Sequence, residues 1–468
     1  MKEFSSVLSK KWVFPDYLDK DNFNQAVDTF HEALFEASNK VLAPKPPKPR
    51  PSFWFSALCR KLISQVRDKR RLSRLDPYNT ERRKDLLITT NKMKRTIKLS
   101  KKLGAAEFAS QVTHANVWRL NNWYRGKRQV YTPILKDPEG NVHVTPAEKA
   151  DLMHNSWFSP PEPLQGNFSW EGTNANTREF QPVTESEIRK VLASTSNTSA
   201  PRSSGIGYKI LKWAWVANPD EMAAIIKASI KLGIHHERWK SSLVVVIPKA
   251  KKPTYSDPKA WRPIQLLDCL GKLIEKIMAK RIIYEIGAYN LVPMEQFGGR
   301  SNSSCYDALI TLTHDVQTAK KSKLVSSFLA VDVKGFFDHV HHDRLIKVLW
   351  DKGFCLETCY WTRSFATNRQ AAIWLDDYVS VLRSIFIGLA QGSPISPTLA
   401  CLYAAEALEK MIENPTYTTT TNRKDKIVKF PVGPRAYVDD HGLHAVGKNF
   451  DESNAGLNEG AEILVSHQ

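Results

Sequence analysis

Long apolar runs are absent from the sequence. No stretch approaches the ~20 consecutive apolar residues that a membrane-spanning helix needs. The first residues, Met-Lys-Glu-Phe-Ser-Ser, lack the apolar core of a secretory signal peptide. Cysteine is also rare, with six residues that form no Cys-x-x-Cys pair of the zinc-binding kind. We therefore expect reduced thiols and no membrane span in an intracellular protein, nuclear or cytoplasmic.

Acidic residues are scarce relative to basic ones. The 468 residues include 67 Lys and Arg but 48 Asp and Glu, which gives a formal net charge of +19. The excess is local, because residues 45–136 hold 24 basic and 5 acidic side chains while the rest of the chain holds 43 of each sign. A hydrophobic content of 42% indicates a globular protein. The asymmetry of charge favours nucleic acid as the partner.

The basic segment has the pattern of a helical nucleic-acid-binding region. Its apolar residues recur at helical spacing, and Trp118, Trp123 and Tyr124 follow its basic clusters. Aromatic rings can stack on bases while Lys and Arg neutralise phosphates. A solvated helix face, with Trp118 in a core, is the alternative interpretation. The predicted nucleic-acid contacts are Arg67, Lys69, Arg70, Arg71, Arg74, Arg82, Arg83 and Lys84.

Three carboxylates lie beside short apolar stretches in the C-terminal half. Residues 328–333 predict a strand that delivers Asp332, and residues 436–446 predict two strands joined by a tight turn carrying Asp439 and Asp440. Carboxylates placed side by side on neighbouring strands make a hard-oxygen site for Mg²⁺, which phosphoryl-transfer enzymes use in pairs. A simple turn carboxylate is the alternative for Asp440.

Basic residues and two predicted helices precede or separate these acids along the sequence. A strand at 243–247 and an extended piece at 260–264 predict a hairpin tipped with Lys and Arg, which would clamp a triphosphate or form a solvated lysine turn. Residues 271–283 predict an amphipathic helix with Glu275 on its polar face, and Pro397 predicts the start of a helix at 398–412.

Several further motifs occur in a fixed order along the chain. Tyr-Val-Asp-Asp alone is a weak match, whereas Gln-Gly-Ser-Pro-Ile-Ser-Pro is far more specific. The segments are Trp239-Lys240, Ile247-Pro248-Lys249, Trp261-Arg262-Pro263-Ile264, Gly271-Lys272, Glu275-Lys276, Gln296-Phe297-Gly298-Gly299-Arg300, Asp332, Phe337-Asp338, Gln391-Gly392-Ser393-Pro394, Ser396-Pro397 and Tyr437-Val438-Asp439-Asp440. Together, over residues 50–450, these segments resemble a reverse transcriptase of the non-LTR retrotransposon (LINE-like) family.

The resemblance implies an α/β (α+β) right-hand polymerase, with fingers and palm preceded by the basic helical region. It implies RNA-directed DNA polymerase activity on an RNA template, a DNA primer and dNTPs. Two Mg²⁺ ions, replaceable by Mn²⁺, would be held by Asp332 and Asp439, with Asp440 assisting in catalysis. Asp338 is interpreted as a helix N-cap or a structural acid.

The resemblance also implies a nucleotide-binding set. Lys249 and Arg262 would hold the triphosphate, and Gln391 and Gly392 would contact the template–nucleotide pair. Phe337 would be the steric gate that excludes a ribose 2′-hydroxyl, with a plain core aromatic as the alternative.

The implied organisation has six parts. Relative to the family, we expect a chain truncated at both ends, without an endonuclease or a thumb. A non-catalytic RNA-binding remnant of a retroelement and a group II intron-type reverse transcriptase are the alternative functions. The predicted parts are a helical segment (1–43), a Pro-rich linker (44–51), the basic helical nucleic-acid-binding region (52–136), a connecting region with the start of the fingers (137–227), the fingers and palm (228–450) and a C-terminal tail (451–468).

Overall fold

The chain forms two compact units in the computed structural model. One comprises Met1–Val41 with Thr132–Gln468, and the other is Leu42–Tyr131. The Pro-rich linker, Trp118, Trp123 and Tyr124 lie outside the described residues. The residues that the structure describes are 2–12, 14–15, 17–41, 55–75, 79–110, 131–160, 170, 174–199, 205–421 and 427–466. Among them, no helix combines the length and apolar character that a membrane crossing requires.

The smaller unit contains a helical hairpin of α3 (Ala57–Leu75) and α4 (Thr80–Ser110). Cys59, Leu62 and Val66 are buried against the partner helix. The predicted helical character of this basic region is confirmed. Lys69 joins the two helices, because its Nζ lies 2.7 Å from Asp85 Oδ1 and 2.8 Å from Thr89 Oγ1.

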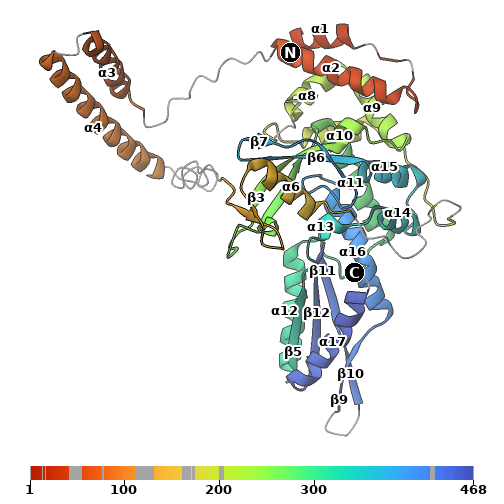
Figure 1. The fold of residues 1–468 in the computed structure, drawn as a ribbon. Helices are drawn as coiled ribbons and strands as arrows, with labels where there is room; N and C mark the ends of the chain where they lie inside the picture. The colour runs from red at the N-terminus through yellow and green to blue at the C-terminus, as the bar shows by residue number, and fades with distance from the viewer. Residues whose placement is uncertain are drawn as a thin grey trace. The chain divides into compact units, whose positions relative to one another are not determined.

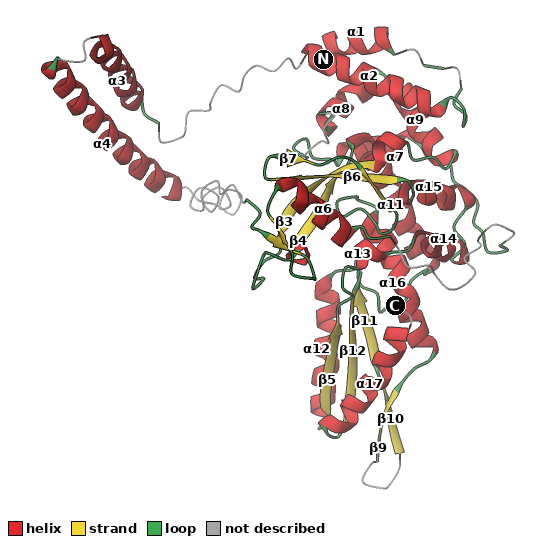
Figure 2. Cartoon of the chain, in the orientation of Figure 1, coloured by secondary structure: helices red, strands yellow, loops and turns green. Residues whose placement is uncertain are grey.

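The larger unit mixes helices and strands (Figures 1 and 2). Its helices are α1 (Lys2–Lys11), α2 (Phe23–Val41), α6 (Pro146–Trp157), α7 (Glu185–Ala193), α8 (Tyr208–Ala217), α9 (Pro219–Lys231), α10 (Glu237–Lys240), η1 (Pro258–Ala260), α11 (Cys269–Tyr289), α12 (Cys305–Lys321), α13 (Phe336–His339), α14 (His342–Asp351), α15 (Leu356–Ala366), α16 (Ser396–Glu413) and α17 (Phe450–Ser466). Its strands are β1 (Leu135–Lys136), β2 (Val142–His143), β3 (Ser241–Pro248), β4 (Trp261–Leu266), β5 (Val325–Val331), β6 (Arg369–Leu375), β7 (Tyr378–Val379), β8 (Arg383–Ile385), β9 (Tyr417–Thr421), β10 (Ile427–Pro431), β11 (Gly433–Tyr437) and β12 (Asp440–Gly447).

A five-stranded sheet has the order β4-β3-β6-β7, with β8 also paired to β6. Strands β3 and β6 are parallel, whereas the β3–β4 pair is an antiparallel hairpin. Helix α6 packs on this sheet, because Met153 and Trp157 share a core cluster with Val244 and Ile373. The predicted hairpin of residues 243–247 and 260–264 is confirmed, and both strands extend slightly beyond those limits.

A separate three-stranded sheet, β11-β12-β5, is antiparallel throughout. We call it the carboxylate sheet because the three predicted acids follow or open its strands. Leu329 and Leu443 point to one face and pack with α16 and α17, while α12 lies against the other face (Figure 1). Helix α16 matches the predicted helix at 398–412, with Pro397 in its first turn.

Helix α11 is longer and more deeply buried than its sequence pattern indicates. The prediction that Glu275 lies on a polar face is wrong, because its side chain is fully buried. Both carboxylate oxygens face buried groups: Ser393 Oγ donates to Glu275 Oε2 at 2.5 Å, and His235 Nε2 lies 3.7 Å from Oε1. Burial raises the pKa of Glu275 to about 7.

This raised pKa gives a testable pH dependence of stability. Because folded Glu275 keeps its proton to higher pH than the unfolded chain, its favourable contribution is complete below pH ~4.5 and is lost as pH rises through about 7. Gln at position 275 does not ionise, so this contribution does not change with pH in Glu275→Gln. Between pH 5 and 7.5, the free energy of unfolding of the variant should therefore rise by about 1–3 kcal/mol relative to that of the wild type. Denaturant titration across this range measures the difference.

The matched control is Glu139→Gln, which removes an exposed carboxylate in the β1–β2 turn. Its difference from the wild type should stay constant with pH. A constant difference for Glu275→Gln as well would contradict the proposed linkage.

Candidate active site

Asp332, Asp439 and Asp440 meet at one end of the carboxylate sheet. Val331, the last residue of β5, pairs with His441, so Asp332 emerges where Asp440 begins β12. Asp332 and Asp440 line the same cavity of about 360 Å³. The prediction that both neighbouring acids occupy the turn is right for Asp439 alone, because Asp440 pairs with Tyr437 as the first residue of β12.

The charges of these carboxylates act on one another. Burial raises the pKa of Asp439, and the negative charges of Asp440 and Asp332 raise it further. Within the described ranges, no three His, Cys, Asp or Glu side chains are grouped closely enough to hold a metal ion together. The donors nevertheless fit a divalent cation, because they are hard carboxylate oxygens whose mutual repulsion a cation would relieve.

The turn that carries Asp439 is conformationally strained. Its two central residues are Val438 and Asp439, between the paired residues Tyr437 and Asp440. Val438 has a φ of +61°, a left-handed conformation that β-branched side chains strongly disfavour. Such a residue costs about 1–3 kcal/mol and persists only where its surroundings impose it.

The predicted cation cluster lies near these acids. Burial lowers the pKa of Lys249, and the positive charges of Lys252 and Arg262 lower it further. The negative charges of Asp338 and Asp332 act in the opposite direction and raise it. Cations and carboxylates from two different sheets are therefore close enough to influence each other. The backbone of Lys249 is held on both sides, since its N–H donates to Ala260 O and its carbonyl accepts from Tyr255 Oη, both at 2.8 Å.

Gln391 and Gly392 are fixed against β4. The Gln265 N–H donates to Gln391 O at 2.7 Å, and Gln391 Nε2 donates to Asp338 Oδ1 at 2.9 Å. Gly392 has a φ of +129°, and a Cβ on it would lie 2.5 Å from Gln265 O, so this position requires glycine. Asp338 is not a helix N-cap, because Gly335 holds that position; burial raises the pKa of Asp338 to about 6.

The two adjacent phenylalanines differ in exposure. Phe336 is 9% exposed and belongs to the core. Phe337 is half-buried, and its carbonyl accepts a hydrogen bond from Leu389 N–H at 2.6 Å. Its backbone is thus attached to the segment that leads into Gln391 and Gly392.

Sequence reasoning missed a buried arginine behind this segment. Arg369 Nη1 donates to Gly388 O at 2.9 Å and Nη2 donates to Gln265 Oε1 at 2.7 Å. The ring of His342 donates to the same Gly388 carbonyl through Nε2 at 2.9 Å. The available signal was an arginine opening an otherwise apolar strand, since a buried charge needs partners.

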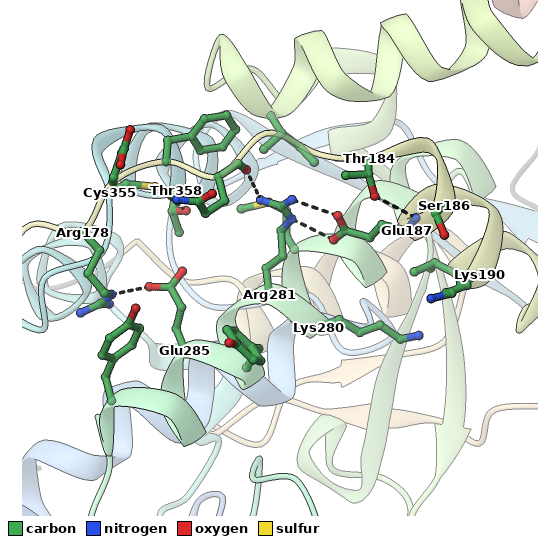
Figure 3. A pocket seen from close by; sticks show the side chains of 18 residues that line it. Arg178, Thr184, Ser186, Glu187, Lys190, Lys280, Arg281, Glu285, Cys355 and Thr358 are labelled. Atoms are coloured by element: carbon green, nitrogen blue, oxygen red, sulfur yellow. Dashed lines mark hydrogen bonds and ion pairs between the residues drawn. The ribbon is translucent and has the colours of Figure 1, made fainter.

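A larger cavity, of about 650 Å³, lies elsewhere, among α7, α11 and the segment around Arg178 (Figure 3). Two ion pairs lie in its lining: Arg178 Nε lies 2.6 Å from Glu285 Oε2, and Arg281 forms two contacts with Glu187 at 2.8 and 2.9 Å. None of the three sequence-predicted catalytic acids lines it. The candidate active site is therefore the carboxylate end of the sheet rather than this cavity.

Comparison with known proteins identifies the domain. A family model described as "Reverse transcriptase (RNA-dependent DNA polymerase)" matches residues 247–449. The chain is 25% identical over 367 residues to the "RNA-directed DNA polymerase from mobile element jockey" of Drosophila melanogaster, which covers 75% of this chain and 38% of that protein. It is 24% identical over 405 residues to the "Probable RNA-directed DNA polymerase from transposon BS" of the same species, which covers 82% and 44%.

A third similarity is to the "Probable RNA-directed DNA polymerase from transposon X-element" of Drosophila melanogaster, 28% identical over 232 residues, 48% of this chain and 24% of that protein. The chain thus spans less than half the length of these relatives. The region matched by the family model contains the three carboxylates, Lys249, Arg262 and the Gln391 segment. Residues 247–449 are therefore similar to a reverse transcriptase domain, and the chain around them is similar to RNA-directed DNA polymerases of mobile elements.

Proposed function

We propose that the chain acts as an RNA-directed DNA polymerase, which adds a dNTP to the 3′-hydroxyl of a DNA primer on an RNA template. One observation carries this proposal: Asp332, Asp439 and Asp440 converge at one end of the carboxylate sheet, and Asp332 lies within electrostatic reach of Lys249. In this proposal the carboxylate sheet is the palm, and the β3–β4 hairpin belongs to the fingers.

Each group has a role that follows from its charge. Asp332 and Asp439 would hold two Mg²⁺ ions, which Mn²⁺ can replace, and Asp440 would add negative charge beside them. When bound, the ions would make the primer hydroxyl more acidic and balance the charge of the phosphates. The primer oxygen forms a bond to the α-phosphorus while the bond to pyrophosphate breaks. Lys249 and Arg262 would stabilise the charge on the departing pyrophosphate.

Primer extension tests the proposal directly. Asp332→Asn keeps the shape of the side chain but removes a charged ligand, so dTTP incorporation on poly(rA)/oligo(dT) with Mg²⁺ should fall by about 10²–10³-fold or more. Asp220→Asn removes an exposed carboxylate on α9 and should leave incorporation unchanged. If the wild type binds RNA but incorporates no nucleotide with Mg²⁺ or Mn²⁺, the chain is a non-catalytic RNA-binding remnant instead.

Phe337 gives a test of sugar selection. If its half-buried ring lies under the incoming sugar, Phe337→Val should reduce the preference for dNTP over rNTP by about 10–100-fold. The ratio of kcat/KM for dTTP and UTP measures this preference. Phe336→Val, in the core next door, should lower stability without changing the ratio. An unchanged ratio in Phe337→Val would leave Phe337 as a plain core aromatic.

The α3–α4 hairpin is the proposed nucleic-acid-binding surface. Arg67, Arg70 and Arg71 on α3 are exposed, as are Arg82, Arg83 and Lys84 on α4. Lys69 differs, because its contacts with Asp85 and Thr89 give it a role in joining the helices. The side chain of Arg74 lies outside the described residues.

Salt dependence tests this surface. Removal of one phosphate-binding side chain should reduce the slope of log K against log salt by about 1, so replacing Arg67, Arg70 and Arg71 by Gln should reduce it by up to ~3. Replacing Lys320, Lys321 and Lys323 removes equal charge from the α12 end and serves as the control. Equal slopes for both triple variants would contradict the assignment of the hairpin.

A further inference from the structure

A short segment before α12 runs alongside the strand that leads to the catalytic turn. Phe297 N–H donates to Ala436 O at 2.8 Å, and Ala436 N–H donates to Glu295 O at 2.9 Å. These two bonds form an isolated parallel bridge beside β11. The residue between them, Gln296, is thereby placed next to the turn of Val438 and Asp439, although 142 residues separate it from Val438 in sequence.

The side chain of Gln296 is fully buried and holds both polar groups of Val438. Its Oε1 accepts from Val438 N–H at 2.9 Å, and its Nε2 donates to Val438 O at 3.1 Å. Oε1 also accepts from Gly298 N–H at 3.0 Å. The side-chain amide of Gln296 therefore pairs both backbone polar groups of Val438 and also bonds to its own loop.

Gly298 completes the contact from the same segment. A Cβ on it would lie 2.5 Å from Val438 N and 2.6 Å from Val438 Cγ2, so the loop backbone lies directly against the turn. The Gly298 carbonyl accepts from the Cys401 thiol of α16 at 3.2 Å. The segment that holds the turn is itself attached to the core.

Two forces act to open this turn. Val438 has a φ of +61°, in the place that this kind of two-residue hairpin usually gives to glycine. Asp439 also experiences the negative charges of Asp440 and Asp332. Within the hairpin, His441 offsets the repulsion in part, because its charge lowers the pKa of Asp439 and its Nδ1 lies 3.0 Å from Asp439 O. The strained backbone of Val438 is instead bonded from outside the hairpin, by Gln296.

We propose that Gln296 is the positioning residue that supplies this interaction, holding Val438 in its strained conformation so that Asp439 stays beside Asp332. The inference rests on the proposed function for its catalytic consequence. The side-chain hydrogen bonds of Gln296 go to Val438 and Gly298 rather than to Lys249 or Arg262, so its loss should lower kcat and leave the KM for the nucleotide nearly unchanged.

The experiment compares Gln296→Met with the wild type in the full chain. Methionine preserves the size of the side chain but makes none of the three hydrogen bonds. We expect the Val438 amide to exchange hydrogen at least about 10-fold faster, as measured by mass spectrometry of peptides from residues 433–447. In primer extension, kcat should fall by about 100-fold, because small displacements of catalytic groups have effects of this size. Gln317→Met, on an exposed position of α12, is the matched control.

A double variant separates positioning from general packing. Val438→Gly removes the side chain that disfavours positive φ. In this background, adding Gln296→Met should lower kcat by less than about 10-fold. A residue that only fills the core would show no such coupling. Circular dichroism of each variant verifies that the fold is retained.

The outcomes are distinct. Faster exchange with a lower kcat and rescue by Val438→Gly supports the inference. Wild-type exchange in Gln296→Met overturns it, as does faster exchange with unchanged kcat. If the wild type itself extends no primer, the proposed function fails, while the exchange data still decide whether Gln296 holds the turn.

Discussion

The structure depends on holding like charges together. Asp332, Asp439 and Asp440 come from two adjacent strands and the turn between β11 and β12, and burial, followed by the negative charges of Asp440 and Asp332, raises the pKa of Asp439. The sheet can bear this cost because its opposite end and one face are well packed against α16 and α17. Apolar burial at a distance from the charges therefore offsets repulsion that the site itself cannot remove.

The segment that carries Gln391 and Gly392 is held by buried polar groups instead of by apolar packing alone. Its polar groups are supported from behind by buried charges, with Arg369 on Gly388 and Gln265 and with Glu275 on Ser393. Each buried charge has partners, yet burial still raises the pKa of Glu275 to about 7 and lowers that of Arg369 to about 10. Such networks contribute little net stability but restrict the backbone to one arrangement.

The sequence was informative where local patterns decide the structure. Strand alternation and turn residues located Asp332 and the Asp439–Asp440 pair, and the β3–β4 hairpin followed from its apolar run. Helical periodicity failed at Glu275, because the pattern assigns charged residues to the solvent face, whereas Glu275 lies with Met278 and Ile282 on the buried side of α11. The distant partners of Gln296 and Arg369 could not be assigned, since Gln296 bonds to Val438 over 142 positions and Arg369 bonds to Gln265 over 104.

The net positive charge is distributed unevenly along the chain. The net charge of +19 is confined to residues 45–136, while the remaining residues balance to zero. In the proposed function, the residues outside 45–136 have no surplus of positive charge that would attract nucleic acid at long range, so Lys249 and Arg262 would act locally. Long-range attraction would then come from the segment that includes the α3–α4 hairpin. Because screening weakens that long-range term far more than the partly buried contacts at the site, salt should affect capture of nucleic acid before it affects the chemistry.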